Sequence, residues 1–355
     1  MVTSIIRRLI PLGAICSIWA IPSCMQYNGE RSAAFPIQSV RFPPVIDTLY
    51  AEPISDALFD LASFSIIDST RILEGTFRSS PDYLFTVSDI QTGEHLFSLC
   101  RYGRGPEEFQ AIAGWTDVHE NKMTALDPST MKYYEIDIDK TQVEGRMVCS
   151  KKMQLDVDQT IPCFPSPVCT LKDEMIAYVA PPNGEAPRYY VYSLTSGGIT
   201  KVFRPFLEIS NKKKKDKIAE ANYFQCFQAI KPDRTKICAA RPKSPLLFIL
   251  DTTTGDTMGV QIKDPLGGLL EDRGFYFRDI TASETKIFVL FAGNEEKKGR
   301  TYLCAFNWDG EFESCYILDQ VYYQVRLNGN RLYLTTDFIK DQRLYSVCLS
   351  SLKQN

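Results

Sequence analysis

The chain has 355 residues, and its 40 lysines and arginines against 43 aspartates and glutamates give a net charge of −3. Because nucleic acid is bound by basic surfaces, this slightly acidic balance argues against nucleic acid as a partner. Only two histidines occur, His95 and His119, which excludes a metal site built from three histidines.

Residues 1–23 have the pattern of an export signal. Arg7 and Arg8 supply the positive start, and residues 9–21 form an apolar run that is short for a membrane span. We therefore exclude this segment from the folded domain.

The sequence Ile21-Pro22-Ser23-Cys24 resembles a bacterial lipobox, in which a signal peptidase cleaves before the cysteine and lipid is attached to its thiol. We expect a lipid anchor on Cys24, followed by a flexible tether over residues 24–36. The protein would then be exported and held in the cell envelope, facing the periplasm or the cell surface. An ordinary secretory signal with a chance cysteine is the alternative.

Five glycine-centred turns recur along the rest of the chain, with strand-like apolar runs on both sides of each turn. They are centred on Gly93, Gly145, Gly198, Gly255 and Gly310, so by subtraction the steps are 52, 53, 57 and 55 residues. A period of about 50 residues with this pattern is typical of a β-propeller. Together with the strands after Tyr323, the repeats predict one all-β domain over residues 37–352, a six-bladed propeller of four-stranded antiparallel blades.

The last predicted blade lacks an outer strand, because the chain ends soon after the apolar run at residues 344–349. Residues 38–42 or 45–50 are the candidates to supply it. Pairing the N- and C-terminal strands in this way would close the ring and remove exposed sheet edges.

Two short motifs resemble a known family. The sequence Tyr102-Gly-Arg-Gly-Pro-Glu-Glu-Phe109 resembles the G-x-G-P-G-E-F signature of the six-bladed, TolB-like propeller lipoproteins of Bacteroidetes, and Phe306-Asn-Trp-Asp-Gly310 resembles their F-D-W-D-G hairpin. Glu107 stands where the family has a glycine. The resemblance covers roughly residues 40–350, and it implies a fold and an envelope location rather than an activity.

The first motif predicts a shaped loop that crosses from one blade to the next, on the face where propellers bind ligands. Gly103 and Gly105 would supply positive φ angles, and Phe109 would anchor the loop against a blade. The charged residues that would line a ligand mouth there are Arg104, Glu107 and Glu108. A purely structural connector is the competing interpretation.

Of the 11 cysteines, Cys16 would leave with the signal and Cys24 would carry lipid, so nine remain. A two-residue turn at Asp309-Gly310 would place Cys304 opposite Cys315, in a hydrogen-bonded pair of the predicted hairpin. This pair and Cys163–Cys169 are candidate disulfides, while most other cysteines fall in apolar runs, where free cysteine packs as a small hydrophobe.

Aspartates recur at predicted strand ends, namely Asp89, Asp127, Asp137, Asp251 and Asp279. Carboxylates gathered around a propeller axis would suit Ca²⁺, and the alternative is that each one caps a local turn. The sequence contains no G-x-S-x-G motif, and no catalytic residue is assigned.

These observations favour an exported, lipid-anchored β-propeller that acts as a binding or assembly module in a bacterial envelope. The expected partner is an envelope protein, a peptide or a glycan, and the membrane would be contacted through the anchor only. The alternative is a metal-assisted hydrolase or lactonase with carboxylates in the propeller channel.

Overall fold

The computed structural model describes residues 35–42, 47–61, 63–75, 82–105, 107–112, 118–156, 166–179, 186–205, 226–242, 244–263, 276–292, 300–336 and 342–352. The predicted export signal, Cys24, the tether up to residue 34, and Cys163 lie outside them. Internal contacts divide the chain into residues 1–31 and 32–355, and all described residues belong to the second unit. None of the helical residues described forms a segment long and apolar enough to cross a bilayer.

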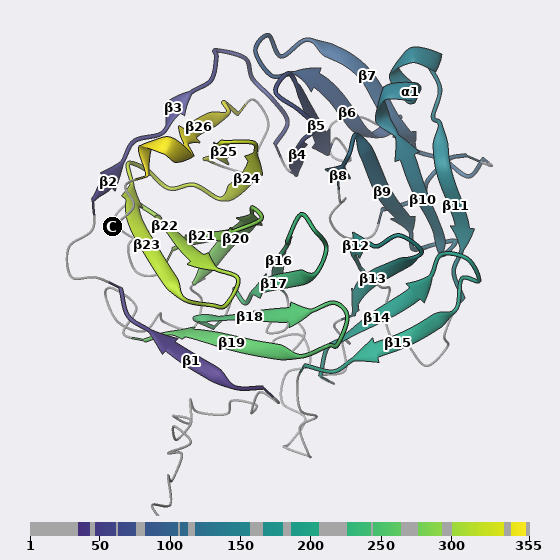
Figure 1. Ribbon diagram of the computed structural model, residues 1–355. Coiled ribbons are helices and arrows are strands. Elements are labelled where there is room, and N and C mark those ends of the chain that lie inside the picture. Colours follow the sequence, from purple (N-terminus) through teal and green to yellow (C-terminus); the bar gives the residue numbers. More distant parts are fainter. Residues whose placement is uncertain are drawn as a thin grey trace, which may run out of the picture. The chain divides into compact units, whose positions relative to one another are not determined.

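The second unit is a six-bladed β-propeller, as predicted, and each blade is an antiparallel sheet whose strands follow one another outward from the axis (Figure 1). Blade 1 consists of β4 (Phe64–Ile66), β5 (Arg71–Gly75), β6 (Tyr83–Asp89) and β7 (His95–Arg101). Blade 2 consists of β8 (Val118–His119), β9 (Lys122–Asp127), β10 (Lys132–Asp137) and β11 (Cys149–Gln154). Blade 3 consists of β12 (Ser166–Thr170), β13 (Glu174–Val179), β14 (Arg188–Ser193) and β15 (Ile199–Phe203).

The second half of the ring follows the same order. Blade 4 consists of β16 (Phe227–Ile230), β17 (Lys236–Ala240), β18 (Leu246–Asp251) and β19 (Thr257–Ile262). Blade 5 consists of β20 (Phe277–Ala282), β21 (Lys286–Phe291), β22 (Tyr302–Asn307) and β23 (Phe312–Leu318). Blade 6 takes β24 (Gln324–Asn328), β25 (Arg331–Thr335) and β26 (Tyr345–Cys348) from the C-terminal part of the chain, and a 3-10 turn (Leu349–Ser351) follows.

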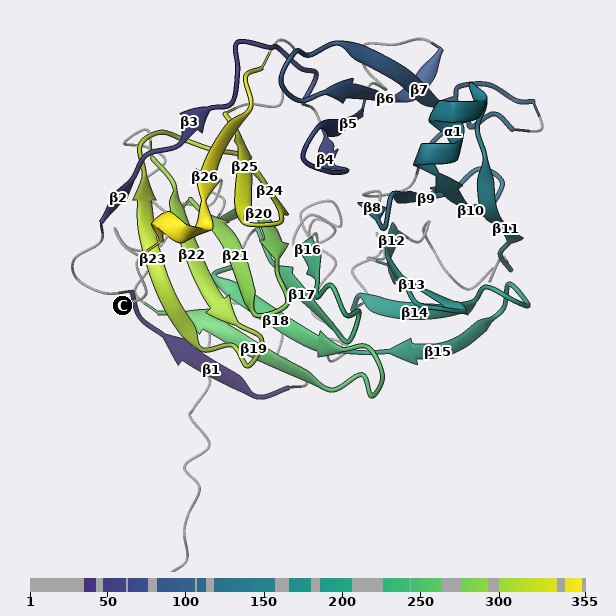
Figure 2. The same cartoon turned by 45° about the horizontal axis from the view of Figure 1, so that its top comes forward.

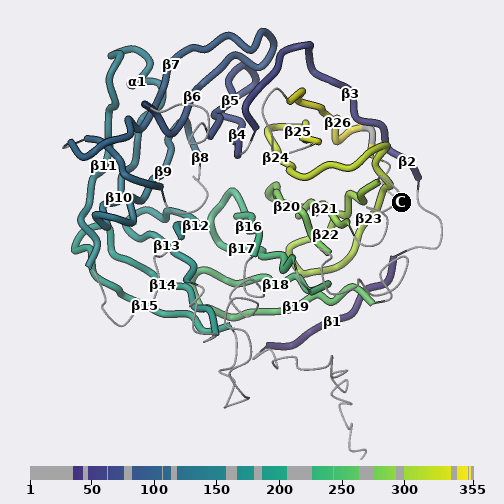
Figure 3. Tube along the Cα trace, turned by 180° about the vertical axis from the view of Figure 1, so that it is seen from behind, coloured from purple at the N-terminus to yellow at the C-terminus, as the bar shows by residue number. Residues whose placement is uncertain are grey.

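Residues 35–42 and 47–61, here called the N-terminal strap, follow the outside of blades 4, 5 and 6 (Figures 2 and 3). Strand β1 (Ile37–Val40) pairs in parallel with β19, and β2 (Thr48–Leu49) pairs in parallel with β23. Strand β3 (Glu52–Pro53) pairs antiparallel with β26 and becomes the fourth strand of blade 6. The chain ends therefore close the ring, as predicted.

The strand that closes blade 6 is not the one expected from the sequence. Strands β1 and β2, which overlap the two candidate segments, are instead the fifth strands of blades 4 and 5, and the closing pairs are Tyr345 with Pro53 and Ser346 with Glu52. Both predicted segments do form strands, but the choice of neighbour depends on how far the chain travels around the ring. Local strand propensity does not contain that information.

The turns between third and fourth strands follow the predicted repeat. Each contains a glycine in the left-handed region, at Gly93 (φ 71°), Gly145 (φ 66°), Gly197 (φ 81°), Gly255 (φ 80°) and Gly310 (φ 77°). In blade 3 the left-handed residue is thus Gly197 rather than Gly198. In blade 2 the connection is a short helix, α1 (Ile138–Glu144), which Asp137 caps at its start and Gly145 at its end.

In blade 5 the turn at Gly310 spans three residues rather than the predicted two. The Asn307 N–H donates to the Glu311 carbonyl, and the register then shifts by one residue between Ala305 and Phe306. This β-bulge compensates for the longer turn, so Cys304 still lies directly opposite Cys315.

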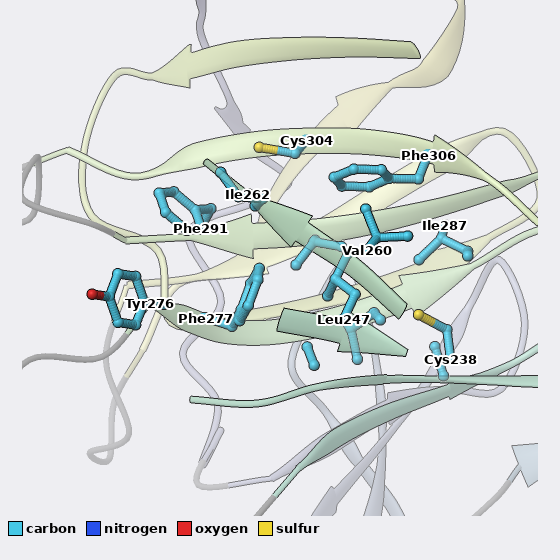
Figure 4. Close-up of a cluster of buried hydrophobic side chains, with 14 of the residues drawn as sticks. Cys238, Leu247, Val260, Ile262, Tyr276, Phe277, Ile287, Phe291, Cys304 and Phe306 are labelled. Carbon is cyan, nitrogen blue, oxygen red and sulfur yellow. The ribbon is translucent and has the colours of Figure 1, made fainter. Parts of the chain in front are cut away.

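The buried apolar side chains of the described residues form six clusters, one at each interface between neighbouring blades. Figure 4 shows the cluster between blades 4 and 5, with Leu247 and Val260 facing Phe291 and Phe306. Middle strands such as β18 and β21 are buried along almost their whole length, because a blade lies against each face.

The strap is attached to blade 5 by aromatic packing. The ring of Phe42 lies 5.3 Å from that of Phe291, 6.0 Å from Tyr302 and 5.7 Å from Phe312, measured between centroids. We expect Phe42→Ala to lower the free energy of unfolding by about 2 kcal/mol, because this packing is lost. Urea unfolding measures the change, with Tyr50→Ala in the same strap as the control, since Tyr50 is 72% exposed.

Candidate functional site

A hollow of about 260 Å³ lies on the propeller axis. It is lined by residues of the first strand of every blade, and the polar ones include His119, Gln228, Asp279 and Arg326. This axial hollow, here called the channel, therefore combines charged and neutral polar side chains.

Arg326 on β24 connects three blades from inside this channel. Its guanidinium forms an ion pair with Asp279 of blade 5, donates to the Phe64 carbonyl of blade 1 (2.9 Å), and lies 5.3 Å from the Phe64 ring. The Asp279 carboxylate also accepts the Val325 N–H at 2.9 Å. Burial raises the pKa of Asp279 above its usual value, although Arg326 and the Val325 N–H act in the opposite direction.

A second hollow, of about 780 Å³, opens beside the axis and shares His119 and Arg234 with the channel. It lies on what we call the turn face, the side of the ring that carries the turns between first and second strands and between third and fourth strands. Its lining comes from blades 2, 3 and 4: His119, Glu120, Lys122, Thr124, Glu135, Ser150, Lys151, Thr170, Leu171, Lys172, Asp233, Arg234, Thr235, Thr252 and Thr253.

This turn-face hollow opens where one face of blade 2 changes from apolar to polar. Leu126 and Tyr133 are cross-strand partners that are fully buried against blade 3. Two residues further along each strand, on the same face, the partners are Thr124 and Glu135, which line the hollow. The two blades therefore pack tightly at one end and separate around polar side chains at the other.

Both signs of charge line the turn-face hollow. Glu135 accepts hydrogen bonds from Lys122 and Ser150, and these contacts lower its pKa although burial opposes them. The pKa of Asp233 falls to about 2, because Lys231 and Thr235 stabilise its carboxylate against the opposing effect of burial. Both carboxylates are therefore ionised at neutral pH, among the cations Lys122, Lys151, Lys172 and Arg234.

Two turns at the edge of the hollow hold non-glycine residues in the left-handed region. They are Glu120 (φ 50°) and Asn121 (φ 57°) in blade 2, and Arg234 (φ 65°) in blade 4. The Arg234 carbonyl accepts from the Thr252 hydroxyl at 2.8 Å, which joins two turns of blade 4. Such backbone strain is often found at functional sites, so it marks this edge of the hollow for mutational study.

The loop with the G-x-G-P-E-E-F pattern crosses from β7 of blade 1 to β8 of blade 2, as predicted. Phe109 is fully buried, with its ring 4.7 Å from that of Tyr134, so its predicted role as an anchor is confirmed. Neither Gly103 nor Gly105 has a positive φ, so the predicted reason for these glycines is wrong. Glu108 folds back over both, accepts the Gly105 N–H at 2.8 Å, and fills the space that a Cβ at Gly103 would need.

The three charged residues of this loop have different surroundings. Arg104 and Glu108 line a separate pocket of about 250 Å³ beside Tyr134, whereas Glu107 is exposed. The residues that line the axial and turn-face hollows do not include any of the three. Their assignment to a ligand mouth stays a prediction, and the contacts of Glu108 give it a structural role within the loop.

Four of the five strand-end aspartates hold local turns. Asp89 accepts the Gln91 and Thr92 N–H groups, Asp127 that of Ser129, Asp137 that of Lys140, and Asp251 those of Thr253 and Thr254. Only Asp279 among them lines the channel. Within the described ranges, no group of three or more histidine, cysteine, aspartate or glutamate side chains is arranged to hold a metal.

The two hollows meet at His119, which the sequence analysis considered only as one of two histidines, and at Arg234, which it did not name. His119 ends β8 and Arg234 lies in the turn between β16 and β17, at positions that look like ordinary surface turns in the sequence. The available signal was the combination of Lys122, Thr124 and Glu135 within otherwise buried strands. Charged residues inside such strands indicate that part of the blade faces water.

The chain matches no family model, and no curated protein matches it in sequence. It is similar in structure to a member of the DUF4221 family from Bacteroides vulgatus, with a TM-score of 0.52 and 10% identity, over 86% of this chain and 96% of that one. At this identity the likeness concerns the fold alone.

Two further solved structures match more distantly. A protein described as exported, from Bacteroides fragilis, has a TM-score of 0.47 and 10% identity, over 88% of this chain and 99% of that one. BamB from Moraxella catarrhalis has a TM-score of 0.40 and 12% identity, over 85% of this chain and 100% of that one.

We predict that Arg326→Met lowers the free energy of unfolding by about 3–5 kcal/mol, because it leaves the buried Asp279 carboxylate without its cation. Adding Asp279→Asn should recover part of the loss. In the single variant the pKa of Asp279 in the folded state is raised further, so the folded variant binds a proton more readily. The loss in free energy of unfolding relative to the wild type should therefore be smaller at about pH 4 than at about pH 7. Urea unfolding measures this, with Arg331→Met as an exposed control. Wild-type stability of Arg326→Met would contradict the role of Arg326 as a brace, by which we mean its contacts with Asp279 and Phe64.

A second prediction concerns the interblade loop. Gly103→Ala should cost about 1–3 kcal/mol, since its Cβ would displace the Glu108 carboxylate and break the hydrogen bond from the Gly105 N–H. In a chain that already carries Glu108→Ala, the same change should cost much less. A double-mutant cycle by thermal unfolding measures the coupling, with Gly198→Ala as a control because a Cβ there comes no closer than 3.2 Å to its nearest neighbour, the Asp156 carboxylate. Equal costs in both backgrounds would show that Glu108 is not the reason for the glycine.

Proposed function

We propose that this chain is an exported, lipid-anchored binding module of a bacterial cell envelope, and that it receives its partner in the turn-face hollow. The partner is an envelope protein, a peptide or a glycan. The proposal rests on the hollow itself. Blades 2, 3 and 4 pack tightly elsewhere but separate there, around charged side chains and threonine and serine hydroxyls.

The size and chemistry of the hollow support a polar partner. A volume of about 780 Å³ is in the range of small-ligand sites, and the lining offers carboxylates, ammonium groups and five threonine hydroxyls. Such groups bind hydroxyl-rich or zwitterionic ligands through several hydrogen bonds at once. Peptide backbones, charged side chains and sugars all have this character.

The envelope location is supported by the sequence. The lipobox-like Ile21-Pro22-Ser23-Cys24 follows a positively charged start and an apolar run. The G-x-G-P-E-E-F loop adds a resemblance to the TolB-like propeller lipoproteins of Bacteroidetes. We therefore propose that Cys24 carries the lipid and that the membrane is contacted through this anchor only.

We favour binding over the alternative of a metal-assisted hydrolase or lactonase. Metal assistance needs carboxylates with free oxygens near one point, and the channel carboxylate Asp279 is engaged by Arg326 and the Val325 N–H. The calcium prediction is tested separately by titration calorimetry, in which heat of binding that is lost in Asp279→Asn would revive the enzyme alternative.

The function is tested by photo-crosslinking in intact cells. A diazirine amino acid replaces Thr253 at the edge of the hollow, in the full-length protein expressed with its own leader. The matched control is Thr195, which has the same position in the equivalent turn of blade 3 and does not line the hollow. We expect adducts from position 253 and few or none from position 195, and mass spectrometry of the adduct shows whether the partner is a protein, a peptide or a glycan.

A charge reversal checks that the adduct depends on the hollow. Lys151 lines it, whereas the next residue, Lys152, points to the other face of β11 and lies 5.2 Å from the Tyr134 ring. Lys151→Glu should reduce the crosslinking yield several-fold and Lys152→Glu should not. Equal yields from positions 253 and 195, or an adduct insensitive to Lys151→Glu, would rule out the hollow as the binding site.

A further inference from the structure

Cys304 on β22 and Cys315 on β23 face each other in the outer half of blade 5. They are direct cross-strand partners, and their Sγ atoms lie 3.3 Å apart. Both side chains are buried in the cluster between blades 4 and 5, where Figure 4 shows Cys304. The two thiols are in contact and shielded from solvent.

The hydrogen-bond pattern places this pair where side chains approach most closely. The Leu318 N–H donates to the Thr301 carbonyl at 2.8 Å, so residues 301 and 318 form a hydrogen-bonded pair. The pairs alternate along an antiparallel ladder, which makes 302 with 317 and 304 with 315 non-hydrogen-bonded pairs. In agreement, the Ile317 N–H points away from β22 and donates to the Asp47 carbonyl of the strap at 2.9 Å.

This position differs from the one predicted from a two-residue turn, which gave a hydrogen-bonded pair. The three-residue turn and the bulge move Cys304 and Cys315 into the other class. Opposite Cα atoms are about 4.5 Å apart in a non-hydrogen-bonded pair, compared with about 5.5 Å in a hydrogen-bonded one. The shorter separation lies within the range that disulfides span, and side chains there approach each other directly.

We propose that Cys304 and Cys315 are joined by a disulfide bond in the exported protein, which rests on the export part of the proposed function. The oxidant is the disulfide of a thiol–disulfide exchange protein in the envelope. One thiolate attacks that disulfide to form a mixed disulfide, and the second thiolate displaces it. The two cysteines lose two protons and two electrons, the S–S bond forms, and the oxidant leaves as a dithiol.

The exchange takes place before blade 5 is packed. Burial raises the pKa of the Cys304 thiol well above its usual value, so the folded protein holds it as an unreactive thiol. In the isolated hairpin the same thiol is exposed to solvent and to the oxidant. Once blade 4 and the strap cover it, the bond is protected from reduction.

The bond would fix the hairpin to which the strap is attached. Strand β2 adds to the outer edge of β23, and Phe42 packs on Phe312 of the same strand. Linking β22 to β23 stabilises this support by restricting the unfolded chain. The cross-link thus acts at the blade on which the N-terminal segment, and with it the proposed anchor, depends.

The test uses the full-length protein exported with its own leader. Cells are quenched with N-ethylmaleimide under denaturing conditions, and the protein is digested without reduction. We expect one peptide pair that contains Cys304 joined to Cys315 in most molecules. Because the folded protein shields the bond, the protein is unfolded and refolded in dithiothreitol before the measurement, and this treatment should lower the Tm of the wild type and of Cys238→Ala by about 5 °C, but not that of Cys304→Ser/Cys315→Ser. Cys238 is the control because it is fully buried in the neighbouring blade.

Two outcomes would overturn the proposal, namely alkylation of both thiols in the exported protein or a disulfide between either one and another cysteine such as Cys163 or Cys169. Protease accessibility in the same cells separates this failure from failure of the proposed function. An exported protein with both thiols free contradicts the disulfide alone. A protein retained in the cytoplasm contradicts the envelope function, and with it the disulfide.

Discussion

The closed ring depends on polar side chains of blade 6 that reach backbone carbonyls in the first strand of blade 1 and just before it. The three inner strands of blade 6 and the strands of blade 1 come from opposite ends of the domain, and the chain joins the two blades where it runs from β3 to β4. Arg326 donates to the Phe64 carbonyl, and Gln324 donates to the Leu61 carbonyl at 2.6 Å. Because buried carbonyls need hydrogen-bond partners, these bonds stabilise the one neighbour arrangement in which both carbonyls are satisfied. The ion pair with Asp279 then extends the same brace to blade 5.

The strap solves a related problem at the rim. A fourth strand exposes unpaired N–H and C=O groups, which invite pairing with other chains. The strap covers this edge in blades 4 and 5 and supplies the edge strand itself in blade 6. In blade 2, by contrast, the edge strand β11 alternates between half-buried and exposed residues and carries Lys151 and Lys152. Charged residues on an exposed edge protect it in another way, so blade 2 and blades 4 to 6 protect their edges by different means.

Local conformational requirements were predictable from the sequence, whereas the pairing of distant segments was not. The left-handed region favours glycine, so the repeat of turns such as Gly93 and Gly255 revealed the blade count. The helix at 138–144 was not predicted, because seven residues are too few to show helical periodicity. Its capping residues Asp137 and Gly145 are nevertheless of the types that commonly begin and end helices. The partner of the strap and the joining of two hollows at His119 depend on which segments meet across the ring.

The turn-face hollow shows how a packed repeat can acquire a site without losing its fold. Each blade must bury both faces of its middle strands, and blade 2 does so with Leu126 and Tyr133 near one end. At the other end the same strands place Thr124 and Glu135 on that face, and Glu135 is held by hydrogen bonds from Lys122 and Ser150 of its own blade. The buried half fixes the position of the polar half, because the four residues share two rigid strands. A site supported in this way is held in place before its partner arrives, which lowers the entropy cost of binding.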